Sequence, residues 1–160
     1  MNSGAMTAAD NFEFDYMFSM DEDCIIRNHK IFEDLISLDK DFVAPLLVDE
    51  KGSDYSNIWP GPKEEMARMG DHTYLLDYLN VADRNFSGFW LVPFVDKCFL
   101  TKRHLIDKIK DFYKKNFDSP VIQQLDPTYP KQSLTFCANM IEQGLFMYVD
   151  NRKSHGTLAV

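Results

Sequence analysis

Three consecutive carboxylates, Asp21, Glu22 and Asp23, are the side chains in this sequence best suited to chemistry. They follow the apolar run Phe12 to Met20, which is dense enough in large residues to form a strand buried on both faces. Open α/β sheets bind ligands at the carboxyl ends of their strands. Oxygen donors at positions i and i+2 suit a hard divalent cation that carries a diphosphate. The pattern therefore indicates Asp21 and Asp23 as candidate metal ligands.

His155, in a polar turn near the carboxyl terminus, is a candidate third ligand, although a plain surface histidine is the simpler interpretation. Glu22 should point away from its two neighbours along an extended backbone. The triplet also has an interpretation without chemistry. It could be a solvated turn from strand to helix, in which Asp21 or Asp23 caps the helix that follows.

Asn57 and Trp59 are candidate substrate-binding residues, because a flat ring beside an amide can hold a sugar. Trp59, Phe89, Trp90 and Phe94 could together form a stacking platform, but in so aromatic a domain they are better interpreted as core. Asn57 could equally serve only the backbone of its own loop. The residue types do not decide between these roles.

Composition excludes several classes of protein. The chain has 160 residues, 45% of them hydrophobic, which is enough for one sizeable core. A net charge of −8 argues against a nucleic-acid surface. No stretch approaches the ~18 apolar residues of a membrane span. Cys24, Cys98 and Cys137 are isolated and odd in number, so we expect buried thiols rather than a disulfide framework.

Two hints about the compartment conflict. The first ten residues have no basic flank and no long apolar run, so they do not form a secretory signal. Asn85-Phe-Ser87, however, is a glycosylation sequon, which predicts a modification at Asn85 in a secreted context.

The hydrophobic patterns predict a mixed α/β sheet flanked by helices. Strands are expected over 12–20, 42–48, 55–59, 87–95, 98–100 and 145–149, and helices over 29–38, 102–115 and 131–143. Residues 72–81 fit either a short helix or an irregular strand, and 49–71 should be a long surface excursion. Pro45 suggests that its strand lies at an edge or is kinked. Asn28 and Thr101 are expected as helix caps, and Gly144 as a helix stop.

Several short sequence motifs then indicate a resemblance to a known family. They are Phe18-Ser-Met-Asp-Glu-Asp23, Val43-Ala-Pro-Leu46, Ser56-Asn-Ile-Trp59, Phe89-Trp-Leu-Val-Pro93, Phe136-Cys-Ala-Asn139 and Phe146-Met-Tyr-Val-Asp-Asn-Arg152. In this order, from about Asp15 onward, they resemble the central glycosyltransferase-like accessory domain of the procollagen lysyl hydroxylases, the procollagen-lysine 2-oxoglutarate 5-dioxygenases. The collagen galactosyltransferases share several of these motifs, including the Asp-X-Asp. The Phe-Cys-Ala-Asn and Trp-X-Val-Pro motifs favour the resemblance to the hydroxylases.

The resemblance implies a parent enzyme in the lumen of the endoplasmic reticulum that hydroxylates collagen lysines with Fe(II), 2-oxoglutarate, ascorbate and dioxygen. It also implies the parent's other domains as partners, collagen as the ultimate substrate, and a homodimer as one assembly open to the parent. The family's iron centre lies in a separate domain and begins with His-X-Asp. None of His29, His72, His104 and His155 begins such a motif. We therefore expect these 160 residues to hold no iron, to need no cofactor and to be inactive alone.

The family pattern is also incomplete at two places. Only about 20 residues precede the Asp-X-Asp, too few for the nucleotide-binding β-α-β unit of ~30 residues in a glycosyltransferase-A fold. We therefore expect residues 1–11 to be a truncated lead-in and 12–160 to be a single, incomplete glycosyltransferase-A-like domain. Where the family reads Asp-Met-Ala-Phe-Cys, this chain has Ser133-Leu-Thr-Phe-Cys137, so a carboxylate that could act as a base is replaced by a hydroxyl.

Two hypotheses follow. In the first, the chain is a non-catalytic accessory module of a procollagen lysyl hydroxylase, with a vestigial acidic site. In the second, it is a metal-dependent collagen hydroxylysine glycosyltransferase, in which Asp21 and Asp23 hold Mn²⁺ and the diphosphate of a UDP-sugar. A third alternative, a complete small protein with an unrelated ligand, stays open.

Overall fold

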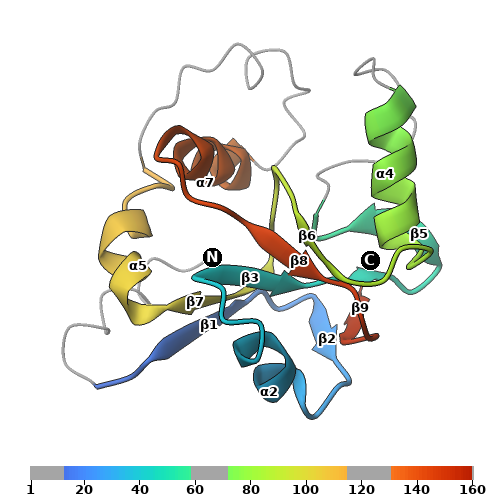
Figure 1. The fold of residues 1–160 in the computed structure, drawn as a ribbon, viewed down its shortest axis with the longest axis horizontal. Coiled ribbons are helices and arrows are strands. Elements are labelled where there is room, and N and C mark those ends of the chain that lie inside the picture. Colours follow the sequence, from blue (N-terminus) through green and yellow to red (C-terminus); the bar gives the residue numbers. More distant parts are fainter. Residues whose placement is uncertain (1–12, 59–71, 115–130, 160) are drawn as a thin grey trace.

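The computed structural model describes residues 13–58, 72–114 and 131–159, which form two mixed sheets with helices packed on them (Figure 1). The larger sheet has the strand order β1-β7-β3-β8-β6. Its strands are β1 (Tyr16–Met20), β3 (Phe42–Pro45), β6 (Phe89–Leu91), β7 (Cys98–Lys102) and β8 (Tyr148–Asp150). β3 pairs antiparallel with β7 and parallel with β8, so the predicted mixed α/β fold is confirmed.

The smaller sheet has the order β2-β9-β4-β5. Its strands are β2 (Cys24–Ile26), β4 (Val48–Asp49), β5 (Gly52–Ser56) and β9 (Gly156–Leu158). β9 comes from the end of the chain and pairs with β2 from its beginning, which joins the two ends of the described chain in one sheet.

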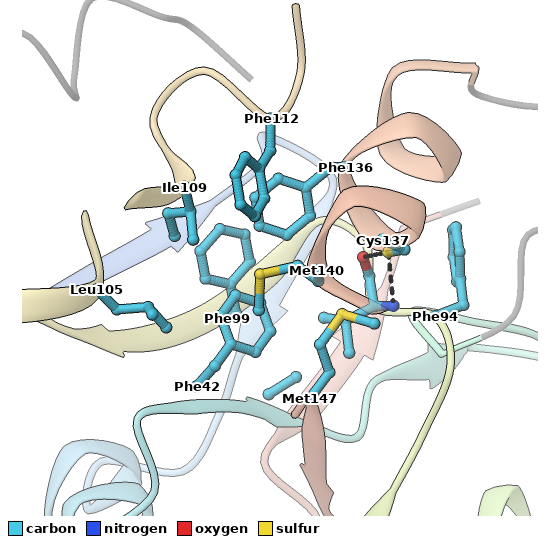
Figure 2. Packing of buried hydrophobic residues seen from close by; sticks show 12 residues of the cluster. Phe42, Phe94, Phe99, Leu105, Ile109, Phe112, Phe136, Cys137, Met140 and Met147 are labelled. Atoms are coloured by element: carbon cyan, nitrogen blue, oxygen red, sulfur yellow. Dashed lines mark hydrogen bonds between the residues drawn. The ribbon is translucent and has the colours of Figure 1, made fainter. Parts of the chain in front are cut away.

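Helices cover both faces of the larger sheet. They are α2 (Ile31–Ile36), α4 (His72–Ala82), α5 (Arg103–Ile109) and α7 (Lys131–Glu142). Successive strand residues point to opposite faces. Phe42 and Phe99 accordingly pack with Phe136 of α7 and with residues of α5 (Figure 2), whereas Val43 and Leu100 pack with Ile31 and Leu35 of α2. The sheet is therefore the middle layer between α2 and the pair α5 and α7.

Several expectations about single elements were wrong. β1 lies at the edge of its sheet and its residues are only half-buried, so it is not the strand buried on both faces. β3 lies in the middle of the sheet, and Pro45 is tolerated because it is the strand's last residue. Ser56, Asn57 and Ile58 are buried, so this part of the expected surface excursion is instead β5 and its flank.

The helix termini also differ from the sequence prediction. Thr101 belongs to β7 and donates its hydroxyl to Asp41 O, while Lys102 takes the cap position of α5. Lys30, not Asn28, takes the cap position of α2. Asn28 lies two residues earlier, where its side chain accepts from Lys30 N and its carbonyl from Ile31 N. Gly144, with φ of 68°, ends α7 as predicted. Residues 72–82 resolve as a helix.

The strand directions bring three chain segments together at one end of the larger sheet. β1 and β3 both run antiparallel to β7, and β3 runs parallel to β8. The carboxyl ends of β1, β3 and β8 therefore lie at the same end of the sheet, where open α/β sheets bind ligands. The residues that follow these strands are the acidic triplet, Leu46 and Asn151.

Candidate functional site

The acidic triplet forms a tight turn between two strands. Asp21 N donates to Lys97 O at 2.8 Å, and Cys24 N donates to Asp21 O at 3.2 Å, which closes a β-turn from β1 into β2. The strand-to-helix turn considered from the sequence is therefore wrong, and neither Asp21 nor Asp23 caps a helix. The turn instead joins the larger sheet to the smaller one.

Lys97 supplies a positive charge to this turn. Its Nζ forms an ion pair with Asp23 Oδ2, and both side chains are about one-third exposed. Its backbone is left-handed, with φ of 67°, a conformation that few non-glycine residues adopt. Burial alone would lower the pKa of Lys97, but the hydrogen bond to Asp23 and the negative charges of Asp23 and Asp96 together outweigh it, so the pKa is raised. The ammonium therefore stays charged at neutral pH beside the carboxylate.

A fourth carboxylate, Asp96, lies next to the three of the turn. Ser133 Oγ, in the first turn of α7, donates to Asp96 Oδ1 at 2.6 Å, and both residues are buried. Partial burial raises the pKa of Asp21, and the nearby charges of Asp96 and Asp23 add to that rise. The hydroxyl of Ser133 is thus bonded to a carboxylate supplied by another loop.

Sequence reasoning missed Asp96 and Lys97, which it treated only as a break between two apolar runs. The signal was present but not local, because it depends on the pairing of β1 with β7. That register sets Met20 opposite Cys98 and so brings the residues before Cys98 to the acidic turn.

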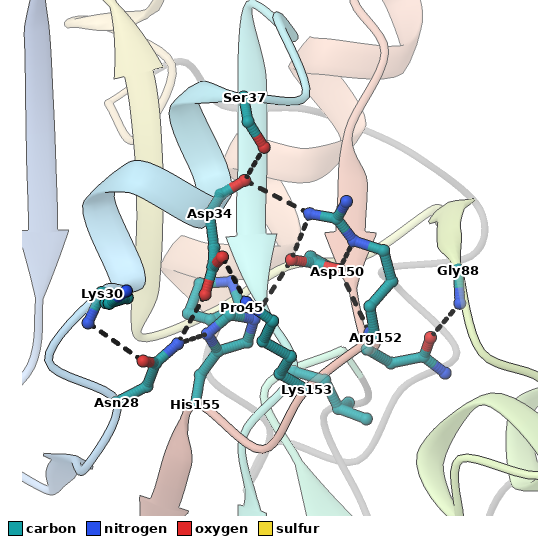
Figure 3. Close-up of polar contacts among 12 residues, drawn as sticks. Asn28, Lys30, Asp34, Ser37, Pro45, Gly88, Asp150, Arg152, Lys153 and His155 are labelled. Atoms are coloured by element: carbon teal, nitrogen blue, oxygen red, sulfur yellow. Dashed lines mark hydrogen bonds and ion pairs between the residues drawn. The ribbon is translucent and has the colours of Figure 1, made fainter.

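His155 lies inside a buried polar network (Figure 3). Asn28 Oδ1 accepts from Lys30 N, so its amide nitrogen is the atom that faces Asp34 at 2.8 Å and His155 Nδ1 at 3.0 Å. Nδ1 therefore accepts a hydrogen bond from the Asn28 amide, and Nε2 donates to Asp150 Oδ2 at 3.1 Å. The imidazole is fully buried, so the expectation of a surface histidine was wrong. Both of its nitrogens are engaged within the fold.

Asp150 is the anionic centre of this network. Arg152 donates to Asp150 from its Nε at 2.8 Å and from its Nη2 at 3.1 Å. Burial alone would raise the pKa of Asp150, but the hydrogen bonds from His155 and Arg152 lower it to about 2. The buried carboxylate is therefore ionised and compensated at neutral pH.

Asn57 is fully buried at the end of β5. Its Oδ1 accepts from Leu47 N and its Nδ2 donates to Pro45 O, both at 2.8 Å. Of the two roles left open by the sequence, the geometry places this amide in service of the backbone that follows β3. Trp59 lies outside the described residues.

The other aromatic candidates do not share one surface. Phe94 is buried in the core, and Phe89 and Trp90 are successive strand residues whose rings point to opposite faces of the sheet. Phe89 is 45% exposed and lies under the ammonium of Lys40. Asn85, the sequon residue, is exposed after α4 and donates to Asn80 Oδ1 at 3.2 Å.

The described residues bring no three His, Cys, Asp or Glu side chains to the spacing of a metal site. A cavity of about 270 Å³ does exist, but it lies at the opposite end of the strands, where β3 and β8 begin. It is lined by Asp39–Asp41, Leu105, Gly144–Phe146 and Tyr148. The acidic turn and this cavity are therefore separate features. None of the helices in the described part of the chain is both long and apolar enough to span a bilayer.

Comparison with known proteins gives a consistent result. Residues 1–160 match the family described as Glycosyltransferase family 25, N-terminal domain. The chain is 30% identical over 156 residues to the multifunctional procollagen lysine hydroxylase and glycosyltransferase of Caenorhabditis elegans, covering 95% of this chain and 19% of that protein. It is 30% identical over 144 residues to human procollagen-lysine,2-oxoglutarate 5-dioxygenase 2, covering 90% of this chain and 18% of that protein. A mimivirus procollagen lysyl hydroxylase and glycosyltransferase is 28% identical over 143 residues, which are 89% of this chain and 15% of the viral protein. The chain thus spans under a fifth of the length of these relatives.

Proposed function

This chain belongs to glycosyltransferase family 25, as its N-terminal domain, and on that premise we propose that it is a glycosyltransferase-like accessory module of a procollagen lysyl hydroxylase, without catalytic activity of its own. Relatives with hydroxylase names match it over about nine-tenths of its length. These relatives are several times longer, so most of each relative lies beyond the matched part.

The observation that carries the proposal is the ion pair between Asp23 and Lys97. A glycosyltransferase of this type needs its Asp-X-Asp carboxylates free for a cation that bridges to a diphosphate. Here a lysine with a raised pKa supplies the positive charge beside Asp23. Asp23, one of the two carboxylates that a metal would need, is therefore already paired with a cation of the protein itself.

The position of Ser133 supports the same conclusion. A transferase needs a carboxylate at the acceptor to take up a proton or to stabilise developing charge. Ser133 places a hydroxyl at the start of α7 and uses it to hold Asp96. The Asp96 carboxylate is almost fully buried, which keeps it from an acceptor sugar.

In the parent protein, the module would pack against the other domains, and collagen would be the substrate of the whole. Fe(II), 2-oxoglutarate and ascorbate would be bound by those other domains. The proposed compartment is the lumen of the endoplasmic reticulum, and the exposed sequon at Asn85 is compatible with it.

A second function is favoured by one specific observation. Burial raises the pKa of Asp21 and the nearby charges of Asp96 and Asp23 add to that rise, and such a cluster of carboxylates attracts cations. The alternative is a glycosyltransferase that uses Mn²⁺ and a UDP-sugar to modify collagen hydroxylysine, with Asp21 and Asp23 at the metal.

Isothermal titration calorimetry with Mn²⁺ and a UDP-sugar separates the two functions. If the chain is an accessory module, neither the unmodified chain nor Asp23→Ala should give saturable heat of binding. The matched control is Asp39→Ala, because Asp39 also forms an ion pair with a lysine, Lys102, but at the opposite end of the strands. Saturable binding that Asp23→Ala abolishes and Asp39→Ala preserves would establish the glycosyltransferase instead.

A further inference from the structure

Two of the three cysteines meet where the two sheets join. Cys24 opens β2 directly after the acidic turn, and Cys98 opens β7 directly after Lys97. Both side chains belong to one apolar cluster with Leu47 and Leu158. This neighbourhood depends on tertiary structure, since the cysteines stand 74 positions apart in the sequence.

The backbone on both sides holds the two sulfur atoms close together. Asp21 N donates to Lys97 O, and the β-turn returns the chain so that Cys24 Sγ lies 3.7 Å from the same Lys97 carbonyl. The side chains of Cys24 and Cys98 interact directly, and this interaction lowers the pKa of Cys24 and raises that of Cys98. The two thiols are therefore neighbours in one apolar cluster at the junction of the two sheets, as a disulfide requires.

We propose that Cys24 and Cys98 are a redox modification site that forms an intrachain disulfide under oxidising conditions. The bond fastens the turn that carries Asp21, Glu22 and Asp23 to the start of β7. It links β2 of the smaller sheet to β7 of the larger one, across a loop of more than 70 residues. The inference goes beyond the proposed function and does not depend on it, because it concerns only the thiols.

The oxidant is a small-molecule disulfide such as oxidised glutathione. Cys24 is 7% exposed and Cys98 is fully buried, so the exchange begins at Cys24. The Cys24 sulfur attacks the small disulfide and releases one thiol, and the Cys98 sulfur then attacks the mixed disulfide and releases the second. The two protein thiols lose two electrons and two protons, and the small disulfide gains them as two free thiols.

Cys137 provides an internal control. It lies in α7, where its sulfur donates to Val95 O at 3.3 Å and accepts from Val95 N at 3.4 Å. Burial raises the pKa of this thiol to about 12. It packs in a different apolar cluster from Cys24 and Cys98, so it should keep its thiol.

The test is to incubate the purified chain with oxidised glutathione, alkylate the remaining thiols in denaturant and map the tryptic peptides without reduction. The sequence makes the product easy to identify, because trypsin releases Cys24 in the fragment 1–27 and Cys98 in the fragment 98–102. The expected result is one linked pair of these fragments, with Cys137 alkylated. The unfolding temperature should rise on oxidation and return with dithiothreitol.

Variants make the assignment specific. Cys137→Ser should still give the linked pair and the thermal shift, whereas Cys24→Ser and Cys98→Ser should give neither. Because Cys98→Ser places a hydroxyl in an apolar cluster, Cys98→Ala is the companion variant if the serine form does not fold. Full alkylation of Cys24 and Cys98 after glutathione treatment would overturn the proposal. So would pairing with Cys137, or links only between two chains.

Discussion

Replacing Asn151 with alanine should be among the single changes that lower the stability of the fold most at the carboxyl ends of the strands. Asn151 is fully buried just after β8. Its Oδ1 accepts from Gly88 N at 2.8 Å and from Trp90 Nε1 at 3.1 Å. Its Nδ2 donates to Val81 O at 2.8 Å and to Phe86 O at 2.6 Å. One side chain thus ties the end of α4 and the start of β6 to the middle of the sheet.

The magnitude follows from the surroundings of these four bonds. The bond to Val81 O is fully buried, and an orphaned buried group costs about 1–3 kcal/mol. The other three are partly buried, so water can reach their partners, and each contributes about 0.5–1.5 kcal/mol. These contributions total about 2.5–7.5 kcal/mol. Because bonds made by one side chain are not independent, Asn151→Ala should lower the free energy of unfolding by about 3–5 kcal/mol.

Urea denaturation followed by far-ultraviolet circular dichroism measures this loss. The far-ultraviolet signal is preferable to tryptophan fluorescence, because the indole of Trp90 is itself a partner of Asn151. Asn85→Ala is the matched control, since its amide makes an exposed hydrogen bond, and it should change stability by less than about 0.5 kcal/mol. A loss below about 1 kcal/mol for Asn151→Ala would refute the view that these polar side chains hold the fold.

Three further outcomes are expected. Hydrogen bonds lower the pKa of Asp150 from 3.8 to about 2, so its ionisation stabilises the fold above pH 4 by about 2.5 kcal/mol. This contribution is lost as the pH falls toward 2. When the free energy of unfolding is measured against pH, Asp150→Asn should therefore lose less stability over that range than the unmodified chain. Gly156→Ala should prevent β9 from pairing, because a Cβ there would stand 2.0 Å from Ile25 O, whereas Gly144→Ala meets no atom within 4 Å and should cost only about 1 kcal/mol for its positive φ, as thermal unfolding can compare. Phe136→Ala should lower the free energy of unfolding by about 3–5 kcal/mol in urea, because the ring is buried among other aromatic rings of the core.

Local patterns predicted the elements well where their hydrophobic stripe is also the buried face. The stripe Leu105, Ile109 and Phe112 is buried as expected, and Cys137 of α7 points inward. Ile141 was expected inward too but is 57% exposed, while Met140 is fully buried. Periodicity gives the angular spacing of a stripe, but it does not fix which neighbouring row meets the sheet.

The site was harder to predict, because its composition depends on strand pairing. The acidic triplet was visible as a motif, but the partners Lys97 and Asp96 reach it only through the register of β1 against β7. His155 looked like a surface residue because its neighbours Lys153 and Ser154 are polar. The network that buries it is assembled from Asn28 and Asp150, which come from opposite ends of the chain. Single-sequence reasoning has no access to such pairings.

The central claim is that Lys97 pairs with Asp23 of the acidic turn and that the turn carries no working metal site. The most direct measurement records amide signals of the isotopically labelled chain by nuclear magnetic resonance, with Mn²⁺ added in the presence of a UDP-sugar. We predict that the signals of Asp21 to Cys24 broaden no more than those of the exposed carboxylates Asp107 and Asp111 of the α5 segment. Selective broadening of the turn, strengthened by the UDP-sugar and removed by Asp23→Ala, would contradict the account.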